Sequence, residues 1–456
     1  MNVQESDYNN QTLYSITWPI FLELSLRMAM GIIATLMLGR YSDAAAAGVG
    51  VGNQLLNLFI LVFNITSIGG TILIGHNLGA RNLKHAERIA HSVFFMNFWF
   101  GVGVSALVVL FGNHFLMFFH LQGNVLHEGL IFIRICGASL FLESLSLALS
   151  AVLRSHGFTK DAMVIAVIMD GISVAGNFFA TTSAFVLPLS GVTGVSWAMV
   201  FARFFAFFAL LFVVWRRLAI RFSLRDCYHA NRKDISDLLS IGIPSAGEGV
   251  SYQFSQLVIT AYVVLIGSTA LAARVYIMNI TMLCFLFTAA IAQGTQLLIA
   301  RYIGGGQFDR AYKRGWRTVL FAAGSSTIVS FIIALLGSDI LGLFTETSAI
   351  VGLGIPVLWM NLFVEPGRAI NIVLMGSLKS AGDVRFPVII GVLSMWTVAV
   401  GLSYVFAIHL GLGLIGIWLA QGADEWFRGI FALKRWHSKP WMRLHPLITK
   451  NDAATK

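Results

Sequence analysis

The sequence predicts an all-α polytopic membrane protein with twelve transmembrane helices in two related six-helix bundles. Of its 456 residues, 57% are hydrophobic and only 11% are charged, whereas soluble domains carry about 25% charged residues. Apolar runs long enough to cross a bilayer recur along the whole chain. Continuous runs of this kind argue against a membrane β-barrel, whose strands alternate in hydrophobicity. The chain also repeats itself, since residues 152–163 and 377–388 follow one pattern 225 positions apart.

Apolar segments of spanning length occur at twelve places, and each is predicted to be a transmembrane helix. The predicted ranges are 13–39, 44–75, 89–112, 127–153, 161–187, 191–215, 238–267, 269–300, 315–337, 349–376, 386–409 and 411–433.

The loops between these spans alternate in charge. One set is rich in basic residues, including Arg81, Arg154 and Lys379, whereas the other set carries only Arg40. Because basic loops stay in the cytoplasm, both termini are expected there, and an even number of spans agrees with this. The net charge of +10 then reflects topology rather than binding to nucleic acid. We therefore expect a multi-pass protein of the plasma (cytoplasmic) membrane.

The repeat extends through both halves of the chain. Pro19 and Glu23 open the first predicted span, and Pro244 and Glu248 open the seventh, again 225 positions later. Since each half has six spans, both halves enter the membrane from the same side, which predicts a pseudo-two-fold axis along the membrane normal. The predicted division is an N-lobe, a cytoplasmic linker and a C-lobe with a basic cytoplasmic tail, at 1–215, 216–237 and 238–456.

Charged residues within the spans are the candidate functional residues, because a charge at the bilayer centre costs about 2.5–3.5 kcal/mol. Glu23 and Arg27 share one helix face. They form either a self-neutralising pair or a cavity-facing acid that titrates. Glu248 is the repeat mate of Glu23, and its face continues with Tyr252 and Gln256 rather than a cation. Glu248 is therefore expected to carry the exchangeable proton, the alternative being a structural hydrogen bond to a facing helix.

A second polar stripe lies in the tenth span. Glu365, Arg368 and Asn371 are three residues apart in turn, so they share a helix face. Pro366 removes a backbone donor and is expected to kink the helix and free carbonyl groups. The stripe is either an ion site or a buried structural pair.

Two further polar groups stand out. Asp170 and Asn177 lie on one face of the fifth span, with Ser173 between them, and are expected to be buried. The twelfth span carries a cluster for which a structural network is favoured, made of Asp424, Glu425 and Arg428.

The order and spacing of short motifs across both halves resemble those of the multidrug and toxic compound extrusion (MATE) family. The motifs are Pro19 with Thr35-Leu-Met-Leu-Gly39, Asn77-Leu-Gly-Ala-Arg-Asn82, Leu153-Arg-Ser-His-Gly157, Gly242-Ile-Pro-Ser245 with Glu248, Glu365-Pro-Gly-Arg368 with Asn371, Leu378-Lys-Ser-Ala-Gly-Asp383, and Asp424-Glu-Trp-Phe-Arg428. The resemblance implies a V-shaped pair of six-helix bundles that exports organic solutes in exchange for H⁺ or Na⁺.

The chain departs from the family pattern at one position. Many family members place an Asp fifteen residues after the first-span proline, in the N-lobe cavity, and here that position is Ala34. In the family the fifth span also helps to form this cavity. Asp170 is therefore expected to substitute for the missing carboxylate.

The expected function is secondary active multidrug efflux by rocker-switch alternating access. The solutes are expected to be cationic or amphipathic, the coupling ion H⁺ or Na⁺, and the protein a monomer in the lipid bilayer without cofactor, metal or nucleic acid. No Walker, nucleophile–base or metal-ligand motif indicates an ATPase or an enzyme. The alternative is a flippase for lipid-linked oligosaccharides, which would need a cationic cavity; candidates for it are Arg27, Arg134, Arg203, Arg274 and Arg368.

Overall fold

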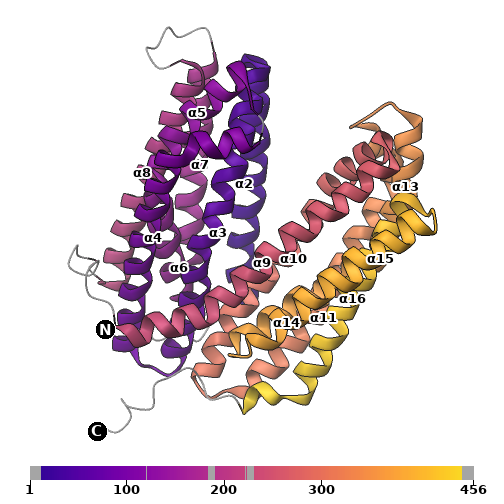
Figure 1. The fold of residues 1–456 in the computed structure, drawn as a ribbon. Coiled ribbons are helices and arrows are strands. Elements are labelled where there is room, and N and C mark those ends of the chain that lie inside the picture. Colours follow the sequence, from indigo (N-terminus) through magenta and orange to yellow (C-terminus); the bar gives the residue numbers. More distant parts are fainter. Residues whose placement is uncertain (1–11, 120, 183–189, 221, 223–230, 444–456) are drawn as a thin grey trace, which may run out of the picture. The chain divides into compact units, whose positions relative to one another are not determined.

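The computed structural model describes residues 12–119, 121–182, 190–220, 222 and 231–443, and every regular element in this part of the chain is helical (Figure 1). The principal helices are α2 (Leu13–Tyr41), α3 (Asp43–Gly79), α4 (Leu83–Phe118), α5 (Gly123–Ala138), α6 (Leu140–Ser155), α7 (Thr159–Thr181), α8 (Gly191–Leu218), α9 (Arg232–Ile266), α10 (Ser268–Gly304), α11 (Phe308–Leu335), α13 (Ser348–Ser380), α14 (Arg385–Ser394) and α16 (Gly413–Ser438). Shorter elements are α12 (Gly337–Gly342), α15 (Gly401–Ser403), η2 (Met395–Val400), η3 (Tyr404–His409) and η4 (Pro440–Met442).

The helices fall at the predicted spans. Within the described residues, ten helices are long and apolar enough to cross a membrane, and the bent pair α5–α6 makes an eleventh. The twelfth predicted span is α16, which is less apolar because it carries Asp424, Glu425 and Arg428 in its middle. The predicted end of the fifth span, residue 187, lies outside the described residues, and α7 ends at Thr181.

Two predicted spans are irregular. The fourth is broken at Ser139, where α5 and α6 meet at 48°. The eleventh runs from Arg385 to His409 as one span, but it contains the wider π-helical turns η2 and η3. Wide turns of this kind often occur at functional sites. The helix α13 continues through Pro366, and Trp426 Nε1 donates a 2.8 Å hydrogen bond to the carbonyl of Phe363 one turn before it.

The chain divides into two compact units, which are Met1–Gly75 with Asn82–Gly242, and His76–Arg81 with Ile243–Lys456. The first unit has a core around Phe63 and Phe132. The second has one core around Trp436 and another around Trp418. The lobe and linker boundaries expected from the sequence stay a prediction.

The end of α3 belongs to the second unit because it packs closely on α10. A Cβ added at Gly79 would lie 2.0 Å from the carbonyl oxygen of Arg301, and one added at Gly304 would lie 1.9 Å from that of His76. Gly304 is the repeat mate of Gly79, and Arg301 that of His76. The two contacts are therefore related by the internal repeat, and only glycine permits this approach.

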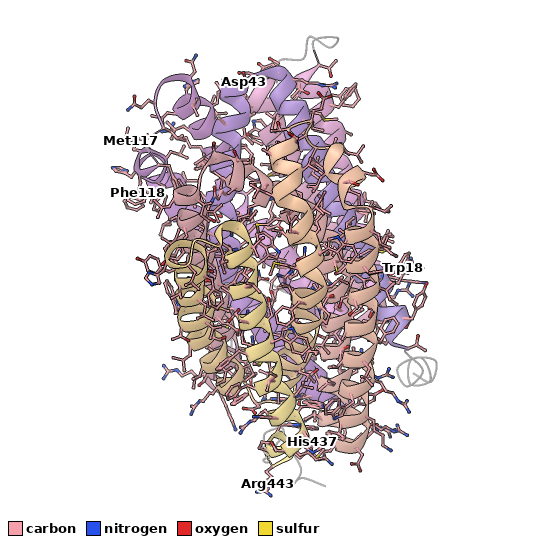
Figure 2. All side chains as sticks on the ribbon, turned by 90° about the vertical axis from the view of Figure 1, so that its right-hand side faces the viewer. Trp18, Asp43, Met117, Phe118, His437 and Arg443 are labelled. Carbon is pink, nitrogen blue, oxygen red and sulfur yellow. The ribbon has the colours of Figure 1, made fainter. Side chains whose placement is uncertain are left out.

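Large apolar side chains are exposed on the helices. Trp18 on α2 is 46% exposed, and Met117 and Phe118 at the end of α4 are 51% and 81% exposed. Figure 2 shows these side chains extending away from the ribbon. Exposed apolar surface on spanning helices is what contact with lipid requires.

Candidate solute and ion sites

The first unit contains a cavity of about 270 Å³ among α2, α3, α7 and α8. Ala34 lines this cavity, so the position at which the family resemblance places an Asp does face it. Asp170 and Asn177 line the same cavity from α7. The predicted polar stripe of the fifth span therefore lines the same cavity as Ala34, the position for which Asp170 was expected to substitute.

Arg27 lies in the cavity between two acids. Its Nη2 is 3.7 Å from Glu23 Oε1, and its Nε is 3.9 Å from Asp170 Oδ2. Both distances are long for an ion pair, and the Arg27 side chain is 45% exposed. Arg27 is therefore an accessible cation of the cavity, and Asp170 lines the cavity beside it.

Glu23 makes its short contacts elsewhere. Arg154 Nη2 donates hydrogen bonds of 2.6 and 2.8 Å to the two carboxylate oxygens of Glu23. The self-neutralising Glu23–Arg27 pair expected from the sequence is the weaker of the two interactions. Arg154 lies 131 residues away in the chain, so helical spacing could not identify it.

Asn177 offers the cavity an acceptor. Its side chain is 3% exposed, and its Oδ1 has no hydrogen-bond partner in the described chain. A buried acceptor left without a donor costs about 1–3 kcal/mol. A solute or water that donates a hydrogen bond there would remove this cost.

Arg203 and Glu143 form a further charged pair of the cavity, beside the break between α5 and α6. Arg203 on α8 donates 2.8 Å hydrogen bonds to the carbonyl of Cys136 and the hydroxyl of Ser139, at the α5–α6 bend. Its Nε lies 3.4 Å from Glu143 Oε2. Arg203 thus satisfies backbone freed by the break and neutralises Glu143.

The polar stripe of α13 becomes part of a larger network in the second unit. Glu365 pairs with Arg368, and Arg368 Nε donates a 3.1 Å hydrogen bond to Glu425 of α16. Asn371 donates a 2.7 Å hydrogen bond to the other carboxylate oxygen of Glu425. The polar stripe and the α16 cluster, which the sequence predicts as two separate groups, therefore form one site.

The α16 side of the network contains the other paired charges. Arg428 contacts Asp424 and lies 3.5 Å from Glu425 Oε2. The hydroxyl of Ser394 on α14 donates a 2.5 Å hydrogen bond to Asp424. Together with Glu365 this makes three carboxylates against the two guanidinium groups of Arg368 and Arg428.

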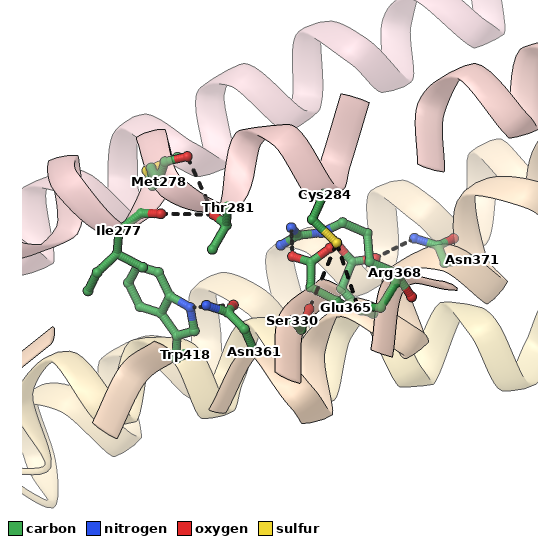
Figure 3. Close-up of polar contacts among 12 residues, drawn as sticks. Ile277, Met278, Thr281, Cys284, Ser330, Asn361, Glu365, Arg368, Asn371 and Trp418 are labelled. Carbon is green, nitrogen blue, oxygen red and sulfur yellow. Dashed lines mark hydrogen bonds and ion pairs between the residues drawn. The ribbon is translucent and has the colours of Figure 1, made fainter. Parts of the chain in front are cut away.

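Glu365 is the carboxylate of this network with a spare oxygen. It is 1% exposed, and its Oε2 accepts no conventional hydrogen bond from any described residue. The weak thiol donor of Cys284 lies beside it, and Figure 3 shows Cys284, Glu365 and Arg368 converging from α10 and α13. Glu365 therefore keeps an oxygen free to accept a proton, in a network with one more carboxylate than guanidinium groups.

The expectation that Glu248 lacks a nearby cation is wrong. Lys379 Nζ donates a 2.5 Å hydrogen bond to Glu248 Oε2, and Lys379 lies at the end of α13, 131 residues later. Spacing along the helix of Glu248 could not identify Lys379, because this partner comes from a different helix. The signal was present in the repeat, since Lys379 and Glu248 are the repeat mates of Arg154 and Glu23.

Tyr252 and Gln256 follow Glu248 on α9. Tyr252 is 41% exposed, and Gln256 Oε1 accepts a 3.0 Å hydrogen bond from Arg274 of α10. These two residues are therefore separate from the Lys379 pair.

The MatE family model matches the chain at residues 19–179 and again at 244–405. The two matches begin at Pro19 and Pro244, as the internal repeat predicts. The chain belongs to the MatE family. Family members are transporters rather than enzymes, so the chain is a multi-pass membrane transporter.

Two known proteins are similar to the chain over nearly their whole length. The chain is 40% identical to the "Uncharacterized transporter YisQ" of Bacillus subtilis (strain 168) over 432 residues, 95% of each protein. It is 27% identical over 436 residues to a "Probable multidrug resistance protein NorM" of Thermotoga maritima, covering 94% of this chain and 92% of that protein.

Solved structures confirm the fold of twelve helices in two bundles. One, described as the "Outward-facing conformation of a multidrug resistance MATE family transporter of the MOP superfamily", aligns with a TM-score of 0.82 at 18% identity, over 93% of this chain and 95% of that one. A MOP superfamily transporter from Pyrococcus furiosus, whose description reports "Reverse polarity of binding pocket", aligns with a TM-score of 0.81 at 18% identity, over 93% and 94% of the two chains.

Proposed function

We propose that this MatE protein is a secondary active multidrug antiporter that exports organic solutes in exchange for H⁺ or Na⁺. It works by rocker-switch alternating access, as a monomer of the plasma membrane with both termini in the cytoplasm. The relative named as a probable multidrug resistance protein supports export of organic solutes. We expect these solutes to be cationic or amphipathic. The solute site is the cavity of the first unit, where Arg27, Asp170 and Asn177 offer charge and hydrogen bonding.

The exchangeable cation is assigned to Glu365. This assignment rests on the extra carboxylate in the α13–α16 network. It also rests on the buried Oε2 of Glu365, which accepts no conventional hydrogen bond from the described residues. An unneutralised charge in a span costs several kcal/mol, so a bound proton or Na⁺ stabilises the state that holds it. Glu248 is a weaker candidate for this role because Lys379 pairs with it alone, whereas Glu365 shares Arg368 with Glu425.

The flippase alternative has less support. A pyrophosphate group needs several unneutralised cations, and three of the candidate arginines each contact a carboxylate: Arg27, Arg203 and Arg368. Arg134 is exposed on α5, and Arg274 alone of the five is both buried and without a carboxylate partner in the described chain.

Uptake of ethidium into proteoliposomes tests the proposal. A pH gradient and a sodium gradient are imposed separately, and the ion that drives uptake identifies the coupling ion. Glu365→Gln should abolish gradient-driven uptake. Glu346→Gln is the matched control, because Glu346 is exposed and should leave uptake unchanged. Full coupled uptake by Glu365→Gln would remove Glu365 from the mechanism, and inertness of the unaltered protein to both gradients would refute antiport.

A further inference from the structure

Arg274 on α10 is a buried cation that no acid among the described residues neutralises. Its residue is 3% exposed. The other arginines below one tenth exposure in the described chain are Arg203 and Arg428, and both contact carboxylates. No described carboxylate pairs with Arg274, and the hydrogen-bond partner it has in the described chain is the uncharged amide of Gln256.

The hydrogen bonding of Arg274 is also incomplete. Its Nη2 donates to Gln256 Oε1 at 3.0 Å. Its Nη1 is buried and has no hydrogen-bond partner among the described residues. A guanidinium presents five N–H donors in a planar fork that fits oxyanions. The buried face of this fork therefore lacks an acceptor as well as a counter-charge.

Glu365, the extra acid of the same unit, is too far from Arg274 to neutralise it. Glu365 lies beside Cys284, which follows Arg274 by ten residues on the continuous helix α10. At about 1.5 Å per residue, this places the two about 15 Å apart along the helix. The second unit thus has an excess negative charge at one depth and an unmatched positive charge at another.

We propose that Arg274 and Gln256 form a binding site for a monovalent anion, which is either a halide or the carboxylate of a small organic acid. The anion accepts from Arg274 Nη1, and the amide of Gln256 orients the guanidinium through its bond to Nη2. Burial explains why an anion is needed, because an isolated buried charge is strongly unfavourable. The site belongs to the second unit and is separate from the solute cavity lined by Arg27, so it extends the proposed function rather than depending on it.

Anion binding to the purified full-length protein in phosphatidylcholine nanodiscs tests this site. Isothermal titration uses sodium benzoate as the probe, in a gluconate buffer without halide, with benzylammonium as the size-matched cation. Benzoate should bind saturably, and benzylammonium should give no heat at this site. Repeating the titration in chloride buffer distinguishes a halide site from a site for organic carboxylates. Competition by chloride indicates a halide site, whereas unchanged benzoate affinity indicates a site for organic acids.

Variants decide whether Arg274 is responsible. Arg274→Gln should weaken benzoate or chloride binding at least tenfold, and Arg134→Gln should not, since Arg134 is exposed. Arg274→Gln removes an unmatched buried charge, so its melting temperature without ligand should not fall. If it nevertheless fails to fold, Gln256→Leu provides the second variant, with weaker binding expected. Absence of anion binding to the unaltered protein, or equal binding by Arg274→Gln, would overturn the proposal, while loss of ethidium antiport alone would not affect it.

Discussion

Lys379 donates a 2.5 Å hydrogen bond to Glu248, and one repeat earlier Arg154 bonds Glu23 at 2.6 and 2.8 Å. Each pair joins the first helix of a repeat to the end of a later helix, α2 to α6 and α9 to α13. The repeated Leu-Arg/Lys-Ser segment therefore supplies the counter-charge for a repeated acid. It contributes a specific interaction as well as marking the duplication.

The Glu248–Lys379 pair should stabilise the second unit. Glu248→Gln leaves the Lys379 ammonium without its partner, and we expect a loss of about 1.5–3 kcal/mol, the usual contribution of a hydrogen bond to a charged group. The double variant Glu248→Gln with Lys379→Met should recover part of this loss. Thermal unfolding in detergent, arranged as a double-mutant cycle, measures the interaction.

The first unit offers the matched cycle at Glu23 and Arg154. A coupling of the same sign is expected there, because both pairs have short contacts and partly buried side chains. Additive effects in both cycles would mean that these pairs are incidental to stability.

Much of the architecture could be predicted from the sequence because hydrophobic length and loop charge act locally. Over the described residues, each predicted span coincides with helical structure, and the repeat is readable from Pro19 and Pro244. Helical spacing also predicts which residues share a helix face, as for Asp170 with Asn177 and Glu365 with Arg368.

Partners from different helices could not be predicted in the same way. Glu425 reaches the Glu365–Arg368 pair from α16, and helical periodicity says nothing about which helices face each other. The break at Ser139 was also missed, because α5 and α6 together read as one continuous apolar stretch. The repeat relates the two acid–base pairs, so either pair predicts the other.

The close contact of α3 with α10 predicts that alanine is not tolerated at Gly79 or Gly304. A Cβ at either position would lie about 2 Å from a backbone oxygen, and backbone cannot rotate away. Overpacking of this kind costs about 1–3 kcal/mol or more. Folded yield and melting temperature should both fall. Gly324→Ala on α11 is the control, because no atom lies within 4 Å of its added Cβ, and alanine there should be neutral or slightly stabilising. Equal behaviour of all three variants would contradict the contact.

Arg203 should be necessary for the broken span. Arg203→Met leaves Glu143 as an unpaired buried carboxylate and removes the donor to the Cys136 carbonyl. Removing one partner of a buried pair costs about 3–5 kcal/mol. Adding Glu143→Gln should restore part of the stability by removing the unpaired charge. Chemical denaturation of the single and double variants measures both effects, and a double variant no more stable than Arg203→Met would argue against the pair.

Asp170 should replace the carboxylate that Ala34 lacks. Both residues line one cavity, so an acid at either position faces the same bound solute. Asp170→Asn should raise the KM for ethidium transport by about tenfold, since a charge pair worth about 1.4 kcal/mol corresponds to that factor. Adding Ala34→Asp to this variant should recover the KM. The comparison is Ala46→Asp on α3, which places an acid elsewhere in the lining of the same cavity. Recovery by Ala34→Asp but not by Ala46→Asp indicates a positional requirement for the acid. If Asp170→Asn transports ethidium with an unchanged KM, the carboxylate has another role, and Arg27 becomes the residue to vary next.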